Sequence, residues 1–107
     1  MQPLPACPVE TTLTLISDKW KILILRDLSS GTKRFGELKK SVTGVSPKVL
    51  TSNLRQMEEN GIVNRVVYAE VPPKVEYSLT ELGYSLDPVL DAMATWGIEY
   101  KKKISLI

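Results

Sequence analysis

Length, composition and charge already exclude several classes of protein. The chain has 107 residues, of which 43% are hydrophobic and 24% are charged, so a single ordinary globular domain is expected. It contains one cysteine and no histidine, which argues against an internal disulfide, a zinc site or a histidine base. We therefore expect no metal, no cofactor and no enzymatic activity. With no apolar run near the ~20 residues of a membrane span, and no recognisable secretory signal, a cytoplasmic protein without a membrane partner is expected.

The N-terminal region predicts an arm and a short helix. Residues 1–6 include two prolines and are expected to form a flexible arm. Cys7 stands in the capping position before a proline, which predicts a helix over residues 8–16. The apolar residues expected to be buried on this helix are Val9, Leu13 and Ile16.

The next fifty residues predict three more helices. Asp18 is expected to cap a helix over residues 19–30, and the wide apolar arc of this helix predicts that it is central and buried. A short extended link leads to a third helix over residues 36–42. Ser46 followed by proline is a strong helix start, and the fourth helix is predicted to run as far as Asn60.

The C-terminal half predicts two strands and a long helical region. Residues 62–68 and 74–79 have strand-like patterns, and the proline-containing connection between them should project as a stiff wing. The last helical region covers residues 80–103, with apolar residues spaced alternately by four and three as in a heptad seam: Leu82, Leu86, Val89, Met93, Trp96 and Tyr100. Asp87-Pro88 either restarts this helix or only kinks it, and the sequence leaves both possibilities open.

Together these elements predict one domain over residues 1–107 that is mainly α with a small β-hairpin wing (α+β). This fold class is a winged helix-turn-helix: residues 36–60 form the helix-turn-helix, 62–79 the wing and 80–103 a C-terminal dimerisation helix. A heptad seam and a separate N-terminal helix exceed what one small core needs, so we expect a homodimer. The expected interface residues are Val9, Leu13, Leu86, Val89, Leu90, Met93, Trp96 and Tyr100.

Positive charge is concentrated around the predicted helix-turn-helix. The net charge is only +2, but residues 33–55 carry six basic residues and one acidic residue, a local charge of +5. The fourth helix has an apolar stripe of Leu50, Leu54 and Met57 and a polar opposite face, as a helix that reads the major groove of DNA requires. The expected residues for binding double-stranded DNA are Lys33, Arg34, Lys39, Ser46, Lys48, Thr51, Ser52, Arg55, Gln56, Arg65 and Lys74.

The residues alone leave alternatives open. An amphipathic helix with one solvated face is common, and charges on a wing also protect an edge strand. A winged-helix module that binds proteins and a small enzyme are the competing functions, although the enzyme would have only Cys7 and scattered carboxylates for chemistry. A thiol at a helix N-terminus is favoured as the reactive thiolate, but most lone cysteines are inert packed residues.

Several segments together resemble the HxlR family of winged-helix regulators, also described as the MarR/DUF24 group. They cover about residues 7–97, and the most distinctive is the wing segment 70–80, EVPPKVEYSLT. The others are Cys7-Pro8-Val9-Glu10, Asp18-Lys19-Trp20-Lys21 with Ile24-Leu25, Lys33-Arg34-Phe35 with Glu37-Leu38, Val49-Leu50-Thr51 with Leu54-Arg55, Glu58-Glu59-Asn60-Gly61-Ile62-Val63 and Trp96-Gly97.

The resemblance implies a cytoplasmic homodimer that binds palindromic promoter DNA as a repressor or an activator. In such families the first and last helices form the dimer. In several members a cysteine at the place of Cys7 senses electrophiles, quinones or disulfide stress, so an oxidant or small-molecule effector is implied for this residue. Because the chain has no second cysteine, an intersubunit disulfide that joins two different cysteine positions is excluded.

Overall fold

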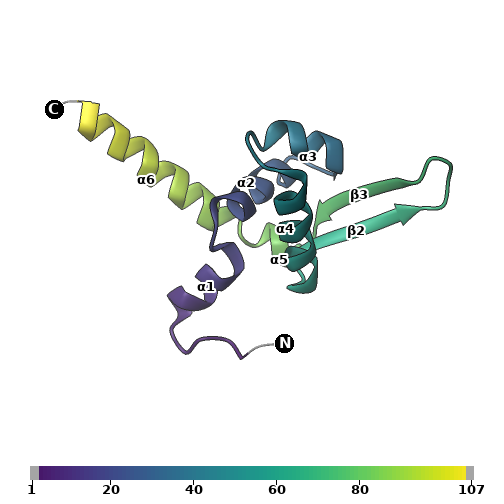
Figure 1. Cartoon of the computed structure of the whole chain (residues 1–107). Helices are drawn as coiled ribbons and strands as arrows, with labels where there is room; N and C mark the ends of the chain where they lie inside the picture. Colours follow the sequence, from purple (N-terminus) through teal and green to yellow (C-terminus); the bar gives the residue numbers. More distant parts are fainter. Residues whose placement is uncertain (1–2, 106–107) are drawn as a thin grey trace.

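The computed structural model describes residues 3–105, which form helices and a small antiparallel sheet (Figure 1). In chain order the elements are α1 (Pro8–Ile16), α2 (Lys19–Leu28), β1 (Lys33–Arg34), α3 (Phe35–Ser41), α4 (Pro47–Glu59), β2 (Val63–Tyr68), β3 (Lys74–Leu79), α5 (Glu81–Tyr84) and α6 (Asp87–Ser105). Within this part of the chain, no helix combines the length and the apolar character needed to cross a bilayer.

The helix α2 lies at the centre of the core. It contacts α1, α3, α4 and β3, and its residues Ile24, Leu25 and Leu28 have no solvent exposure. Asp18 starts the helix, because its Oδ1 accepts a hydrogen bond of 2.8 Å from the backbone amide of Lys21. The prediction of a central buried helix capped by Asp18 is confirmed, although the helix ends at Leu28 rather than Ser30.

The helix α4 begins and packs as its sequence predicts. Ser46 Oγ accepts a hydrogen bond of 3.1 Å from the amide of Val49, and a proline occupies the first helical position. The predicted stripe of Leu50, Leu54 and Met57 is buried, each residue being at most 2% exposed. Burial of this stripe fixes which side of α4 faces solvent.

The sheet has one more strand than the sequence predicted. Its order is β1-β3-β2, and the extended link before α3 contains β1, in which Lys33 pairs with Tyr77 and Arg34 with Glu76. The strands β2 and β3 form the predicted hairpin, which projects from the helices as a wing (Figure 1). A two-residue strand has too short a pattern to be recognised from its own sequence.

The C-terminal helical region is two helices rather than one. Thr80 Oγ1 accepts from the amide of Gly83 and starts α5, which ends at Tyr84, and Asp87 then opens α6. The proline at position 88 therefore restarts the helix, and the predicted seam is interrupted between Leu82 and the residues of α6. Ser29 Oγ on α2 also donates a hydrogen bond of 2.8 Å to Asp87 Oδ1, tying the start of α6 to the core.

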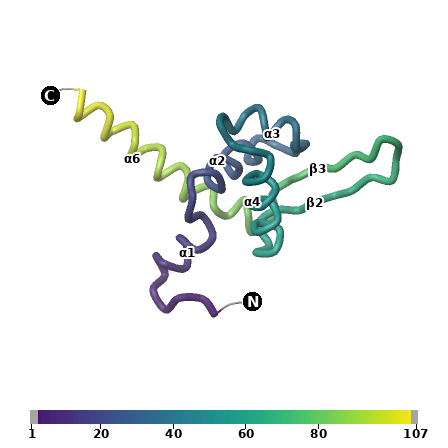
Figure 2. Tube along the Cα trace, in the orientation of Figure 1, coloured from purple at the N-terminus to yellow at the C-terminus, as the bar shows by residue number. Residues whose placement is uncertain are grey.

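Both terminal helices project from the body on the side away from the wing (Figures 1 and 2). No residue of α6 is buried. The described chain measures 56 × 34 × 24 Å, and its radius of gyration is 15.6 Å, above the ~13 Å expected for a compact domain of this size. In the part of the chain that the structure describes, α6 therefore lacks packing partners over most of its length.

The prediction that α1 buries three apolar residues needs correction. Val9 and Leu13 are 68% and 53% exposed, so the expectation that α1 buries them is wrong for the single chain, and only Ile16 is buried. Within residues 3–105, that face of α1 is therefore left largely uncovered. The predicted flexible arm includes residues 1–2, which lie outside the described residues, while Pro5 contacts α1 by accepting a 3.1 Å hydrogen bond from Thr11 Oγ1.

Candidate nucleic-acid interface

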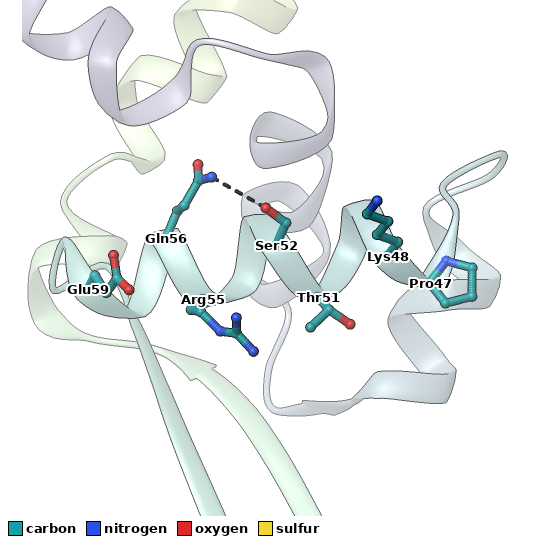
Figure 3. Close-up of a pocket in the computed structure, with 7 residues that line it drawn as sticks. All are labelled: Pro47, Lys48, Thr51, Ser52, Arg55, Gln56 and Glu59. Carbon is teal, nitrogen blue, oxygen red and sulfur yellow. Dashed lines mark hydrogen bonds between the residues drawn. The ribbon is translucent and has the colours of Figure 1, made fainter.

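The solvent-facing side of α4 is a continuous polar surface, which we call the α4 face. It forms an open hollow lined by residues of this helix alone: Pro47, Lys48, Thr51, Ser52, Arg55, Gln56 and Glu59. Figure 3 shows Lys48, Ser52 and Gln56 along one edge of the helix, whereas Thr51 and Arg55 point towards the other. Gln56 Nε2 donates a 3.4 Å hydrogen bond to Ser52 Oγ. The α4 face thus presents donors and acceptors without a large apolar side chain.

The turn and α3 hold α4 in place. Val42 and Val45 are buried on either side of Gly44, whose φ of +89° is a conformation that glycine adopts without a steric penalty. Asp27 on α2 fixes the end of α3 by accepting a 2.6 Å hydrogen bond from Ser41 Oγ. The sequence-predicted helix-turn-helix geometry therefore depends on contacts to α2 as well as on its own turn.

Asp27 is a strongly engaged carboxylate. Its Oδ1 also accepts a hydrogen bond of 2.8 Å from Arg26 Nε. Partial burial raises the pKa of the Asp27 carboxyl, but the hydrogen bonds from Arg26 and Ser41 and the nearby positive charges outweigh burial, so this pKa lies below its ordinary value. The charged form of Asp27 is therefore the one that joins α2 to α3.

A second hollow lies between α4 and the base of the wing. Its lining consists of Thr51, Leu54, Arg55 and Glu58 from α4, Arg65 from β2 and Tyr77 from β3. In an antiparallel sheet, paired residues project on the same side, so Lys33, Tyr77 and Arg65 form one row across the sheet. Tyr77 was not among the predicted site residues, because an alternating strand pattern does not show which residues meet a helix.

The remaining predicted DNA-binding residues differ in how far their side chains are buried or already engaged in contacts within the chain. Lys74 Nζ lies 3.6 Å from Glu76 Oε2 and 4.9 Å from the centre of the Tyr68 ring, so its charge is already engaged within the wing. The same Glu76 carboxylate raises the pKa of the Tyr68 hydroxyl. Arg34 is exposed at the start of α3, where its backbone amide donates to Glu37, and Lys33 and Lys39 are half-buried. Ser46 is used as a cap.

Cys7 lies on a separate part of the molecule. Its thiol is free and exposed, and the residue occupies the N-cap position of α1, as predicted. The Cys7 carbonyl accepts hydrogen bonds from Thr11, 3.0 Å from its amide and 3.2 Å from its hydroxyl. Cys7 does not contribute to the α4 face.

The predicted dimer residues divide into two groups. Leu86, Val89 and Leu90 pack partly against the core of their own chain, which attaches α6 to the body. Beyond them Met93, Trp96 and Tyr100 are 45%, 68% and 49% exposed, and the Trp96 and Tyr100 rings stack with centroids 5.2 Å apart. Ile98 and Ile104, which were not among the predicted interface residues, are also about half exposed.

The three-stranded sheet, the projecting wing and the exposed polar face of a well-seated α4 define a winged helix-turn-helix protein. A family model described as HxlR-like helix-turn-helix matches residues 15–105. The chain belongs to this family of helix-turn-helix transcriptional regulators, as the resemblance in its sequence indicated.

Individual relatives agree with this assignment. The chain is 50% identical over 98 residues to an uncharacterised helix-turn-helix transcriptional regulator, YdeP of Bacillus subtilis, with 92% of this chain and 77% of the relative covered. The structure of this chain is similar to that of the redox regulator HypR in its reduced form, with a TM-score of 0.87 and 42% identity. The match covers 94% of this chain and 100% of the HypR chain. The structure is also similar to diamide-treated YodB from B. subtilis, with a TM-score of 0.74, 38% identity and coverages of 88% and 94%.

Proposed function

We propose that this chain regulates transcription as a homodimer that binds palindromic promoter DNA, with α4 as the recognition helix. The α4 face carries this proposal. Its seven lining residues are all solvent-facing, while the opposite stripe of α4 is locked in the core. A helix held in this way enters a major groove as a rigid body, and only its outer side chains need to adapt to the bases.

Different parts of the surface are assigned different tasks. On the α4 face, Gln56, Ser52 and Thr51 have the chemistry to contact base edges, and the guanidinium of Arg55 has the geometry to bind a guanine. The basic residues Lys33, Arg34, Lys39, Lys48 and Arg65 are assigned to the phosphate backbone. Lys74 is assigned a weaker backbone contact, because Glu76 offsets its charge. Ser46 acts mainly through the start of the helix that it caps.

A second copy of the chain is the proposed partner of α1 and α6. Both helices lie on the side of the body away from the wing, so pairing there leaves both α4 faces open to DNA (Figure 1). The exposed residues proposed to form the contact are those of the predicted stripes: Val9, Leu13, Met93, Trp96 and Tyr100. A two-fold axis through such an interface would give two recognition helices, each able to enter one half of a palindrome about one helical turn apart.

Titration of promoter DNA against salt tests the proposal. A duplex containing an inverted repeat from the upstream region of the gene should bind tightly, and the logarithm of affinity should fall with the logarithm of salt by ~0.9 per neutralised phosphate. A scrambled duplex of the same composition is the control and should bind more weakly. Absence of binding to either duplex at low salt would rule out the proposal.

A redox or electrophile response through Cys7 is a second part of the proposal. It is supported by the free, exposed thiol at the start of α1 and by the similarity to HypR, a redox regulator, and to diamide-treated YodB. The thiolate would add to a quinone, forming a thioether as the quinone ring becomes a hydroquinone. Alternatively it would form a disulfide with a small thiol or with the partner's Cys7, in which case an oxidant such as diamide takes up the two electrons and two protons. An adduct beside α1 would alter how the two subunits pair.

Wild type and Cys7→Ser, titrated on operator DNA with and without diamide or benzoquinone, test this response. We expect the oxidant to weaken DNA binding by wild type and to leave the serine variant unchanged. An equal response of the two proteins, or none in either, would make Cys7 a structural residue. Neither part of the proposal gives the chain a catalytic role, a cofactor or a membrane partner, and promoter binding would be carried out in the cytoplasm.

A further inference from the structure

Two arginines from different elements line the hollow between α4 and the base of the wing. Arg55 projects from α4 and Arg65 from β2, and both line this space of about 280 Å³ together with the hydroxyl-bearing residues Thr51 and Tyr77. Within residues 3–105 neither guanidinium takes part in an ion pair or a side-chain hydrogen bond. Two unpaired guanidinium groups beside two hydroxyl groups form a set of donors suited to one oxyanion.

We propose that this hollow is an oxyanion site in which Arg55 and Arg65 bind the same phosphate group. The backbone phosphate of bound DNA is one source of that group and free inorganic phosphate is the other. Guanidinium groups pair with phosphate oxygens through two parallel hydrogen bonds, and two such groups on separate elements contact a tetrahedral anion from different sides. The buried Leu54 and Tyr77, which packs against the core, also line this space.

Acidic and basic neighbours of the hollow determine its net charge. Glu58 is the one acidic residue in its lining, so the two arginines leave a net charge of +1. Lys33 adds a further positive charge on the far side of Tyr77 in the same row of the sheet. A carboxylate at the rim opposes anion binding, which predicts that Glu58→Gln tightens the site while Arg55→Ala or Arg65→Ala weakens it.

This inference deepens the proposed function and rests on it for the DNA source of the phosphate. It also changes one assignment, because an Arg55 side chain that shares a phosphate with Arg65 contacts the DNA backbone and not a guanine. Figure 3 supports this change, since Arg55 and Thr51 point away from the edge that carries Lys48, Ser52 and Gln56. Base reading would then belong to the Gln56 edge of α4.

A double-mutant cycle on DNA tests the shared phosphate. Operator binding is measured for wild type, Arg55→Ala, Arg65→Ala and the double variant, on duplexes in which single phosphates are replaced by neutral methylphosphonates. Either single variant should lose about tenfold in affinity, and the double variant should lose far less than the product of the two. One methylphosphonate position should weaken wild type and have no effect on either variant. Arg34→Ala, an exposed arginine outside the hollow, is the matched control and should combine additively.

A second arm uses inorganic phosphate without DNA. The Nε–Hε resonances of Arg55 and Arg65 are followed by NMR as phosphate replaces chloride at constant ionic strength, and Glu58→Gln is expected to respond at lower phosphate concentration. Shifts of both arginines without coupling on DNA would support a free anion as the occupant. Additive variants with no phosphate response would overturn the inference, as would a loss of base preference in Arg55→Ala. If wild type binds no DNA, the proposed function fails and the phosphate titration alone decides the site.

Discussion

The helices α4 and α6 are both amphipathic, but within residues 3–105 only α4 has its apolar stripe buried. The apolar stripe of α4 is buried to at least 98%, whereas none of the 19 residues of α6 is buried, and its Trp96 is 68% exposed. An apolar stripe therefore predicts that a helix face is buried, but the sequence alone does not say whether the same chain or another chain buries it. This difference predicts that changes in α4 affect folding and that changes in α6 affect assembly.

The largest expected effect is on the folding of the body. Leu50→Ala removes a side chain with no solvent exposure and should lower the free energy of unfolding by ~2–5 kcal/mol, because it leaves a cavity in the core. Urea denaturation at a fixed protein concentration measures this free energy of unfolding. Val71→Ala, at a position that is 98% exposed in the wing, is the control and should change stability by less than ~0.5 kcal/mol. Equal effects of the two substitutions would contradict the burial of the α4 stripe in the core.

The next effect is on assembly. Trp96→Ala should raise the dimer dissociation constant by about thirtyfold, the loss typical of a central aromatic residue in an interface, without changing the helix content. Sedimentation at several concentrations gives the constant, and circular dichroism gives the helix content. Ile98→Ala is the matched control, since Ile98 is 54% exposed on a different side of α6. A dimer unchanged by Trp96→Ala would show that this stripe does not form the interface.

A smaller effect is expected on the recognition of the DNA base sequence. Gln56→Ala should reduce discrimination at one base pair by ~1–3 kcal/mol, because a bidentate amide contact to adenine is lost. Lys48→Ala should weaken binding to operator and scrambled DNA about equally, and it should reduce the salt slope by about one phosphate. Competition binding with single-base operator variants separates the two outcomes. If Gln56→Ala behaves like Lys48→Ala, the Gln56 edge of α4 does not read bases.

The smallest effect concerns the link between α2 and α3. Asp27→Asn should cost about 1 kcal/mol of stability at neutral pH, since the hydrogen bonds of a carboxylate are weakened. The folded-state pKa of Asp27 is depressed, so its contribution is present above the ordinary carboxyl pKa of about 4 and is lost as the pH falls through the lower folded value. The difference from wild type should therefore vanish in strong acid. Asp91→Asn, at an exposed position, is the control.

Local signals predicted those parts of the fold that depend on neighbouring residues. Asp18 and Ser46 were recognised as caps because a capping side chain contacts an amide three residues along the chain. The burial of α4 followed from its helical spacing. The error at Val9 and Leu13 has a different origin, because periodicity marks an apolar face but not whether that face meets its own core.

The candidate site was only partly predictable for the same reason. The polar residues of the α4 face were selected correctly as solvent-facing, since they lie opposite the apolar stripe. The approach of Arg65 and Tyr77 to Arg55 depends on how the sheet packs against α4, which is a contact between distant segments. The strand β1 escaped prediction likewise, because its pairing with β3 joins residues more than forty positions apart.

The hydrogen bond between Ser29 and Asp87 has a mechanical consequence. It lies beside α2 at the base of α6, whose 19 residues extend for about 28 Å. A small change of angle at this base therefore produces a large displacement at the far end of the helix. A rotation of about 10° at that base moves the far end by about 5 Å, more than the ~3.4 Å rise between stacked bases. In the proposed dimer, the angle of α6 at its base would therefore affect the distance between half-sites that the two subunits can span, and the Ser29–Asp87 hydrogen bond is one of the contacts that hold this angle.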